Sequence, residues 1–478
     1  MTRQDSFLDA FFGPKSIALI GVTTRFGFGA GLPRFMIKSG MRDKLYLVNP
    51  KIKEMEGLPV YRSVKEIPNT IDLACILVPA SAVGGVLNEC LEKGIKAVIV
   101  MSAGFAETGD DGRAMQEKLV RMARSAGARL LGPNCVGVVN VPGRFATCEV
   151  LLEHLQPGPI SIIAQSGVFG NILLDWAPSQ GIPIAKVATI GNRADIDEAD
   201  LLEYLHQDPD TKVIVLYLES LQRPGHFLEV AQRTSMDKPI LVYLGGETEA
   251  GRRATMSHTG SLGGSRPIEE GLLRQAGLLM ATDPIELFDM ARTFAFCPLP
   301  EGNRILVVTS SGSLGVMAAD TLLKEGLSLP LLSEQARAHI REKAPPWMNV
   351  GNPLDVGPSG IFNHALEAAL REPGIDGIII FPIIPWAVIS PVLESNPEVV
   401  AGMFVREGPM SGQPLPRPII ASVLGHPAWK DSVARFFGNK VPIVSSPQAA
   451  ARSMAALYRY AKWRGVRETP AAVAHYGA

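Results

Sequence analysis

The residue whose surroundings most favour chemistry in this sequence is a histidine, His258. It lies in the segment GETEAGRRATMSHTGSLGG, residues 246–264, among serine, threonine and glycine rather than apolar neighbours. Small residues of this kind predict a mobile loop, whereas a core histidine sits at strand or helix spacing among apolar residues. A mobile imidazole could act as a nucleophile that takes up a phosphoryl group. The plainer interpretation is an exposed loop histidine.

Two turns rich in serine and glycine, Gln165–Gly170 and Ser310–Gly315, each follow a predicted strand and open a predicted helix. The free N–H groups and the positive dipole end of a helix N-terminus suit a phosphate. Two such turns in different domains could hold one phosphohistidine from opposite sides. Either turn alone would be an ordinary connection between a strand and a helix.

A carboxylate, Glu219, ends the apolar run VIVLYLE, at the edge of a sheet where ligands of open α/β folds bind. It could accept a hydrogen bond from one imidazole nitrogen and leave the other nucleophilic. The alternative is a strand-end residue that faces solvent. The acidic stretch in GNRADIDEADLLEYL, residues 191–205, predicts the N-terminus of a helix.

A glycine-rich loop follows the first predicted strand, with Gly21, Gly27, Gly29 and Gly31 around Arg25. Such a loop lets backbone N–H groups approach a phosphate, although it can also be merely a tight turn. A nicotinamide-binding domain usually ends its second strand on an acid, but here the sequence is Asn49-Pro50-Lys51. A lysine at this point favours a phosphate, so coenzyme A is a better candidate than NAD. A surface lysine is the alternative.

Short apolar runs alternate with helical stretches and predict the elements that position these residues. Ten runs predict strands: 16–21, 45–48, 73–78, 97–101, 160–164, 213–218, 240–244, 305–308, 377–381 and 419–423. Alternating strands and helices without hairpin signals predict parallel, doubly wound sheets. Breaks rich in proline and glycine divide the chain into three domains, 1–142, 143–297 and 303–465, with a tail at 466–478.

Composition excludes several classes of protein. The 478 residues hold 46 Lys and Arg against 47 Asp and Glu, so there is no basic field to hold a nucleic acid. The five cysteines form no CxxC pair and no metal-like pattern with histidines, so no metal site is predicted. The first residues lack the apolar stretch of a signal peptide, and the most apolar tract, 377–393, is broken by prolines. These features predict a soluble, cytoplasmic protein away from membranes.

Five motifs carry a resemblance that runs to about residue 465: GPNCVGVVN (132–140), AQSGVFGN (164–171), GNRADIDEADLLEYL (191–205), EAGRRATMSHTGSLGG (249–264) and VGNPLDVG (350–357). The chain resembles the NDP-forming acyl-CoA synthetases, relatives of succinyl-CoA synthetase, and among them α subunits of the ADP-forming acetate–CoA ligase type. The resemblance implies an α/β fold, with an N-terminal Rossmann-like CoA-binding domain followed by two flavodoxin-like (succinyl-CoA synthetase-like) domains.

The resemblance also implies roles for particular residues. His258 would be the phosphorylated histidine and Glu219 its partner carboxylate. The residues at the two phosphate-facing helices would be Gln165, Ser166 and Gly167, and Ser311, Gly312 and Ser313. The residues of the CoA region would be Gly21, Val22, Thr23, Arg25, Asn49, Pro50, Lys51, Val78, Pro79, Ser102 and Asn134.

The family needs an ATP-grasp module for ATP or ADP with Mg²⁺, and the three α/β domains leave no block for one. The resemblance therefore implies a separate β subunit, in an α2β2 arrangement. The expected reaction interconverts acyl-CoA, phosphate and ADP (or GDP) with a small carboxylic acid, CoA and ATP (or GTP). The alternatives are a non-catalytic CoA or acyl-CoA sensor of the same fold and a nicotinamide-dependent oxidoreductase. Candidates for the acyl pocket, or simply for the core, are Trp176, Trp347, Trp386 and Met348.

Overall fold

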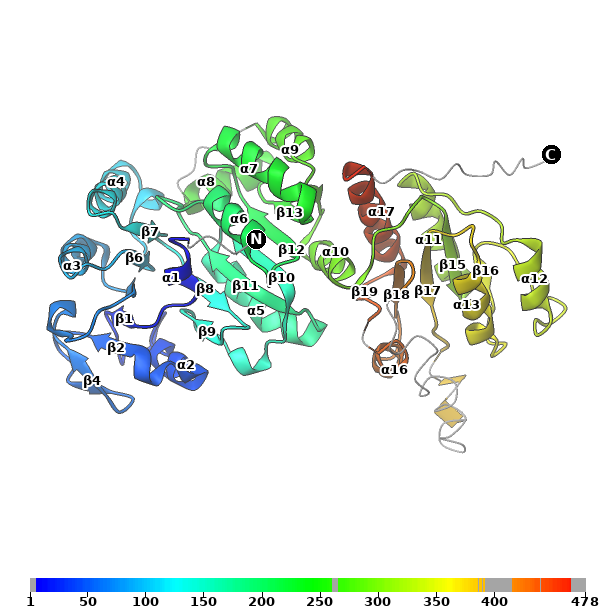
Figure 1. The fold of residues 1–478 in the computed structure, drawn as a ribbon, viewed down its shortest axis with the longest axis horizontal. Coiled ribbons are helices and arrows are strands. Elements are labelled where there is room, and N and C mark those ends of the chain that lie inside the picture. Colours follow the sequence, from blue (N-terminus) through cyan, green and yellow to red (C-terminus); the bar gives the residue numbers. More distant parts are fainter. Residues whose placement is uncertain are drawn as a thin grey trace. The chain divides into compact units, whose positions relative to one another are not determined.

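The computed structural model describes residues 6–259, 265–385, 387–388, 390–391, 415–438 and 440–465, while the side chains of residues 252, 256–259, 428 and 432 lie outside what it describes. The chain forms two compact units, Met1–Met280 and Ala281–Ala478 (Figure 1). Unit 1 contains two sheets and unit 2 contains one.

The first sheet of unit 1 has seven strands in the order β3-β4-β2-β1-β5-β6-β7. Its pairs are parallel except that between β3 and β4. The strands are β1 Ile17–Ile20, β2 Leu45–Val48, β3 Glu54–Met55, β4 Leu58–Tyr61, β5 Leu73–Ile76, β6 Ala97–Val100 and β7 Arg129–Leu131. The helices of this part are α1 Asp9–Phe12, α2 Leu32–Met36, α3 Ala80–Glu92 and α4 Asp110–Ser125, with a 3-10 turn, η4, at Ala106–Thr108.

The second sheet of unit 1 also has seven strands, in the order β14-β13-β12-β10-β11-β8-β9. The strands are β8 Gly137–Asn140, β9 Phe145–Ala146, β10 Pro157–Ala164, β11 Ile184–Thr189, β12 Val213–Leu218, β13 Ile240–Leu244 and β14 Leu279–Met280. The helices are α5 Gly167–Gln180, α6 Glu198–Gln207, α7 Pro224–Asp237, α8 Glu249–Thr259 and α9 Arg266–Gln275. The pairs from β11 through β14 are parallel, as predicted, but β8, which was not predicted, runs antiparallel to both β11 and β9.

The turn at 140–143, read from the sequence as the end of the first domain, joins β8 to β9 within the second sheet. Asn140 closes it, since its Oδ1 accepts a hydrogen bond from Gly143 N at 3.0 Å. The domain limits given above stay a prediction.

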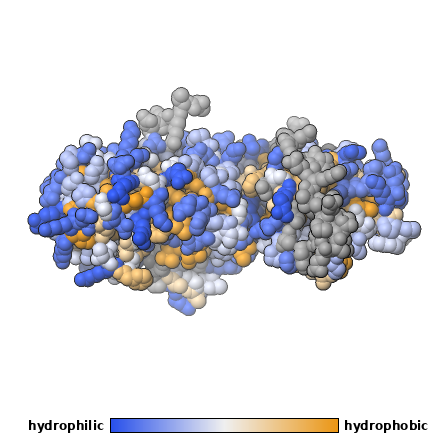
Figure 2. Space-filling view, turned by 90° about the horizontal axis from the view of Figure 1, so that it is seen from below, coloured by the Kyte–Doolittle hydropathy of each residue, from blue (hydrophilic) through white to orange (hydrophobic). Residues whose placement is uncertain are grey.

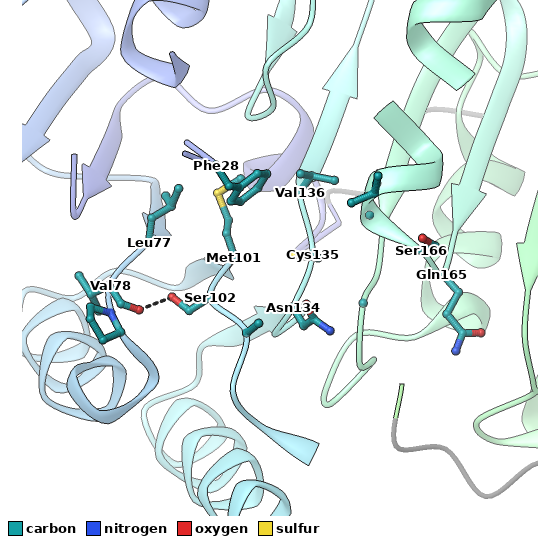
Figure 3. A pocket seen from close by; sticks show the side chains of 15 residues that line it. Phe28, Leu77, Val78, Met101, Ser102, Asn134, Cys135, Val136, Gln165 and Ser166 are labelled. Atoms are coloured by element: carbon teal, nitrogen blue, oxygen red, sulfur yellow. Dashed lines mark hydrogen bonds between the residues drawn. The ribbon is translucent and has the colours of Figure 1, made fainter. Parts of the chain in front are cut away.

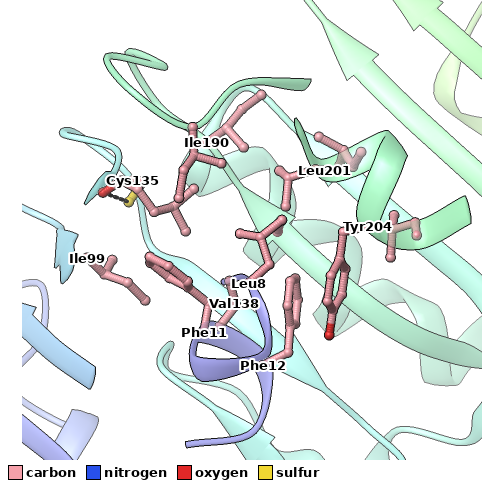
Figure 4. Packing of buried hydrophobic residues seen from close by; sticks show 14 of the residues in the cluster. Leu8, Phe11, Phe12, Ile99, Cys135, Val138, Ile190, Leu201 and Tyr204 are labelled. Atoms are coloured by element: carbon pink, nitrogen blue, oxygen red, sulfur yellow. Dashed lines mark hydrogen bonds between the residues drawn. The ribbon is translucent and has the colours of Figure 1, made fainter. Parts of the chain in front are cut away.

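One hydrophobic cluster runs from the first sheet of unit 1 into the second. Phe11 and Phe12 of α1 are buried within it, together with Ile99 of β6 and Val138 of β8 (Figure 4). The ring of Phe12 stacks on that of Tyr204 in α6, with centroids 5.0 Å apart. The two sheets therefore share a core, which fixes the segments between them.

Unit 2 has a parallel sheet of five strands in the order β16-β15-β17-β18-β19. The strands are β15 Ile305–Thr309, β16 Leu354–Asp355, β17 Gly377–Phe381, β18 Ile419–Ser422 and β19 Ile443–Val444. The helices are α10 Pro284–Phe296, α11 Gly312–Lys324, α12 Glu334–Arg341, α13 Phe362–Arg371, α16 Ala428–Phe436 and α17 Pro447–Trp463. Helix α10 packs on α17 through an edge contact between Phe294 and Tyr460. Unit 2 therefore begins before β15, the strand predicted to open the last domain.

In the described ranges, none of the helices combines the length and hydrophobicity that crossing a lipid bilayer requires. On the face drawn in Figure 2, hydrophilic residues surround scattered hydrophobic ones rather than an extended apolar band.

Candidate functional site

A cavity of about 480 Å³ lies in unit 1, at the carboxyl ends of strands of the first sheet and beside the start of α5 (Figure 3). Its walls include Val78 and Pro79 after β5, Ser102 after β6, and Asn134, which are four of the residues assigned to CoA by resemblance. The others in that set do not line it. Ser102 is fixed in the wall, because its hydroxyl donates to Val78 O at 2.6 Å.

The glycine-rich loop after β1 lies at the same edge of the first sheet. Gly21 has φ of 96°, and a Cβ there would come within 2.3 Å of Leu77 O, so only glycine fits. The side chain of Asn49 holds this loop against the end of β2: its Nδ2 donates to Val22 O at 2.7 Å, and its Oδ1 accepts from Lys51 N at 2.8 Å. Lys51 is exposed.

The N-terminus of α5 faces the cavity with Gln165, Ser166 and Gly167 (Figure 3). Ser166 is the N-cap residue, and its Oγ accepts from Phe169 N at 3.4 Å. Gln165 is 1% exposed, and its Nε2 has no hydrogen-bond partner among the described residues. A buried amide donor beside free helix N–H groups is suited to an anion.

Glu219 directly follows β12 and is buried beside this turn. Its backbone N donates to Gln165 Oε1 at 2.7 Å, so the structure brings together the two residues that the sequence analysis placed in one site. The hydroxyl of Tyr217 donates to Glu219 Oε1 at 3.4 Å. Burial and the charge of Glu219 raise the pKa of Tyr217, which keeps this hydroxyl protonated as a donor to the carboxylate.

Arg193, which was not predicted from the sequence, binds Ser220, the residue that follows Glu219. Its guanidinium is buried, donates to Ser220 O at 2.7 Å and to Ser220 Oγ at 2.8 Å, and pairs with Glu198 at 3.2 Å. Gly191 and Arg193 both have φ of 55°, and a Cβ at Gly191 would lie 2.3 Å from Pro133 O. The GNR motif at residues 191–193 could have indicated this arginine, but it was interpreted only as part of the segment that leads into the next helix. That helix, α6, starts as predicted, with Asp197 as its cap in a capping box.

The backbone conformation around His258 differs in part from the prediction. A mobile loop was predicted, but the backbone is helical up to Thr259, in α8. The segment before the histidine favours a helix, as in the ion pair of Glu249 with Arg253 at 2.7 Å. Helix α8 lies against η4 of the first sheet's part of the unit. The side chain of His258 and residues 260–264 lie outside what the structure describes.

In unit 2, Ser311 precedes α11 as predicted, and Gly312 and Ser313 form its first turn. The hydroxyls of Ser311 and Ser313 are 3.1 Å apart. The carboxylate of Asp355 also lies close, since a Cβ on Gly312 would be 2.7 Å from Asp355 Oδ2. An acid at the N-terminus of α11 was not predicted from the sequence; its Oδ1 accepts a hydrogen bond from Gly357 N at 3.0 Å.

Cys135 lines the cavity, but burial raises the pKa of its thiol to about 12. The thiol is therefore protonated at neutral pH and is no nucleophile. Of the acyl-pocket candidates, Trp176, Trp347 and Met348 do not line this cavity, and Trp386 lies outside the described residues.

Comparison with known proteins agrees with this arrangement. Three family models match the chain in order: a CoA binding domain at residues 15–141, a succinyl-CoA ligase like flavodoxin domain at 157–294 and a ligase-CoA domain at 305–469. This order of domains defines a CoA ligase of the succinyl-CoA synthetase type. The match also bears out CoA, rather than NAD, as the ligand predicted for the first domain.

Relatives define the family more closely. The α subunit of ADP-forming acetate–CoA ligase I of Pyrococcus furiosus is 36% identical over 469 residues, which cover 96% of this chain and 98% of the relative. An ADP-forming acetate–CoA ligase of Methanocaldococcus jannaschii is 33% identical over 96% of this chain but only 64% of its own length. The chain belongs to the family of ADP-forming acetate–CoA ligase α subunits and their longer relatives.

A solved structure agrees with the fold over nearly the whole chain. The dinucleotide-forming acetyl-coenzyme A synthetase 1 of Ca. Korarchaeum cryptofilum, in complex with phosphate and ADP, has a TM-score of 0.83 at 32% identity, covering 96% of this chain and 98% of that one. The α/β fold class, with a CoA-binding domain followed by flavodoxin-like ligase domains, is confirmed.

Proposed function

We propose that this chain is the α subunit of an ADP-forming acyl-CoA ligase in which His258 carries a phosphoryl group from the CoA site to a nucleotide on a partner subunit. The observation that carries this proposal is that the CoA-binding edge and the start of α5 line one cavity, at which Gln165 accepts a hydrogen bond from the backbone of Glu219. A non-catalytic CoA or acyl-CoA sensor explains this site less well, because CoA binding alone does not require a buried carboxylate fixed beside an anion site.

The reaction can be written in balanced steps. An oxygen of phosphate attacks the thioester carbon of acyl-CoA, and the CoA sulfur leaves, which gives an acyl phosphate. A ring nitrogen of His258 then attacks the phosphorus, and the carboxylate of the acid leaves. Finally, a terminal oxygen of ADP (or GDP) attacks the same phosphorus, the bond to the histidine breaks, and ATP (or GTP) forms with free histidine.

The described residues supply positions and charge for these steps. The free N–H groups of α5 and the Nε2 donor of Gln165 stabilise the oxygens of the phosphoryl group. Glu219 accepts the N–H of the imidazole nitrogen that does not react, and stabilises the positive charge that develops on the ring. We assign a second phosphate-binding role to Ser311, Gly312 and Ser313 at the start of α11. Gly21, Val22, Thr23, Arg25, Asn49, Pro50 and Lys51 are proposed to bind CoA.

A partner subunit is implied by the naming of the relatives as α subunits. We propose that the partner is an ATP-grasp β subunit that binds the nucleotide with Mg²⁺, and that the two form an α2β2 complex. The greater length of the Methanocaldococcus jannaschii relative, of which this chain spans 64%, supports a further module outside this chain. The five free thiols support a reducing, cytoplasmic environment.

The test of this function is reconstitution. The chain is mixed with an ATP-grasp partner, acetyl-CoA, phosphate and ADP, and ATP is measured with time. ATP formation that requires both chains and phosphate is expected. Formation by either chain alone, or no formation by the pair with any acyl-CoA, would contradict the proposal.

Replacing Glu219 by glutamine is expected to lower kcat of the reconstituted enzyme about 100-fold, because the amide keeps the shape but loses the charge that supports the imidazole. The KM for CoA should change little. Glu229→Gln, an exposed residue of α7 away from the cavity, is the matched control and should retain wild-type kcat. Equal kcat in the two variants would remove Glu219 from the mechanism.

A further inference from the structure

Three side chains that can ligate a metal ion converge in unit 2, and none of them lines the cavity beside α5. They are His339 in the last turn of α12, Glu342 directly after that helix, and His364 in the first turn of α13. One possible ligand atom on each lies within 4.8 Å of those on the other two. In the part of the chain that the structure describes, no other three histidine, cysteine or acidic side chains converge in this way.

The end of α12 places the first two of these side chains. His339 and Glu342 are three residues apart, a spacing that puts two side chains on one face of a helix. Nδ1 of His339 lies 3.3 Å from Glu342 Oε2. The neighbouring arginines, Arg337 and Arg341, both pair with Glu334 instead, so the Glu342 carboxylate is directed to the imidazole rather than to a guanidinium.

The third side chain, His364, is fixed by a contact between the two helices. Its Nε2 donates to His339 O at 2.8 Å, and the two imidazole rings have centroids 4.3 Å apart. A carbonyl oxygen can only accept, so Nε2 carries the proton and Nδ1 of the neutral ring keeps its lone pair. A histidine that binds a metal is typically oriented in this way, by a hydrogen bond from its other ring nitrogen to a backbone carbonyl.

This group of side chains is accessible to an ion and electrostatically suited to a cation. The side chains of His339 and Glu342 are 37% and 65% exposed, so an ion can reach them directly from water. The last carbonyl groups of α12 carry partial negative charge, which adds to the charge of the carboxylate. A cation bound here would gain from both, besides the lone pairs of the imidazoles.

The donor atoms select the class of ion. Two imidazole nitrogens and one carboxylate oxygen suit Zn²⁺, and also Co²⁺ and Ni²⁺. Mg²⁺ prefers oxygen ligands throughout and would bind poorly. Three protein ligands leave a position for water on a tetrahedral ion.

We propose that His339, Glu342 and His364 bind one divalent transition-metal ion, Zn²⁺ being the best suited, and that this ion ties the end of α12 to the start of α13. The site goes beyond the proposed ligase function and does not depend on it. No metal site was predicted from the sequence, because His364 follows Glu342 by more than twenty residues and only the fold brings the two together.

Calorimetric titration of the full chain with ZnCl₂, after removal of metals by a chelator, tests the site. One Zn²⁺ ion per chain should bind, and MgCl₂ should show no saturable binding at the same concentrations. His364→Gln should weaken Zn²⁺ binding by about tenfold or more, because the amide can keep the hydrogen bond to His339 O but lacks the ring nitrogen. No binding by the wild type, or Mg²⁺ binding as tight as that of Zn²⁺, overturns the proposal.

His206→Gln is the matched control. His206 also pairs with a carboxylate, Asp237, at 2.7 Å, but this pair has no third ligand among the described residues. Its replacement should leave Zn²⁺ affinity as in the wild type. Equal affinity in the wild type and His364→Gln, or an equal loss in the two variants, would contradict the assignment of His364 as a ligand.

Hydrogen exchange of the wild-type chain locates the ion without any substitution. With Zn²⁺ at about ten times its Kd, amides that exchange through opening of the site should exchange about tenfold more slowly. The slower exchange should appear in peptides from α12 and α13 and not in those from unit 1. Protection confined to other segments, with none in these two helices, would place the ion elsewhere and overturn the proposal.

Discussion

Replacing His258 by alanine is expected to abolish turnover of acyl-CoA, with kcat lower on the order of 10⁴-fold or more. The proposed mechanism has one covalent carrier between acyl phosphate and nucleotide, so its loss leaves no path for the phosphoryl group. CoA binding should be retained, because the residues assigned to CoA lie at the edge of the first sheet and do not include this histidine. The measurements are the initial rate of ATP formation and calorimetric titration with CoA.

His226→Ala is the control for this variant. His226 lies on α7, in the same unit, and does not line the cavity. Its replacement should leave kcat within about twofold of the wild type. Turnover by the His258→Ala enzyme at a rate near that of the control would show that the histidine is not the carrier.

Replacing Asp195 by alanine is expected to destabilise the chain by about 3–5 kcal/mol. The Asp195 side chain has no exposed area, and it accepts hydrogen bonds from Arg124 Nε at 2.8 Å, Arg129 Nε at 2.9 Å and the buried Leu130 N at 2.8 Å. Arg124 and Arg129 belong to α4 and β7 of the first sheet's part, whereas Asp195 follows β11 of the second. Its loss leaves the buried N–H of Leu130 and the largely buried guanidinium of Arg129 without this acceptor where the two parts of unit 1 meet, while the more exposed Arg124 stays in contact with water.

The free energy of unfolding in urea measures this effect. Glu203→Ala is a matched control, because Glu203 forms an exposed ion pair with Arg233 at 2.7 Å, and such pairs contribute at most about 1 kcal/mol. A loss at Asp195 no larger than that at Glu203 would mean that the buried carboxylate does not hold the two parts of unit 1 together.

The ten strands predicted from apolar runs are all present, but nine other strands of the described residues were not predicted, and β11 is one of them. The run IPIAKVAT contains Lys186, which interrupts the apolar pattern expected of a central strand. In the fold, Lys186 is buried and its Nζ pairs with Asp208 at 2.8 Å and Asp210 at 2.9 Å. An ion pair to residues more than twenty positions away lets a lysine occupy a buried strand, and local patterns cannot reveal it.

The part of the candidate site at the start of α5 could be predicted from the sequence. Gln165 and Ser166 follow a strand and open a helix, and Glu219 ends a neighbouring strand, so parallel order alone brings them together. The apolar wall of the cavity was not predicted, because Phe28 and Val136 lie in motifs that were interpreted through their glycines and Asn134, and the sequence does not show that these two side chains meet. Large residues such as Trp347 were the candidates for the acyl pocket instead, but Trp347 does not line the cavity.

Transfer of a phosphoryl group to this chain tests the central proposal most directly. The α chain and its partner are incubated with ATP labelled at the γ phosphate, and the label on α is followed through acid and base treatment and located by peptide mapping. We predict a label that is labile in acid, stable in base, located at His258 and absent from His258→Ala. A label that persists in His258→Ala, or no label on the wild-type chain, would contradict the account.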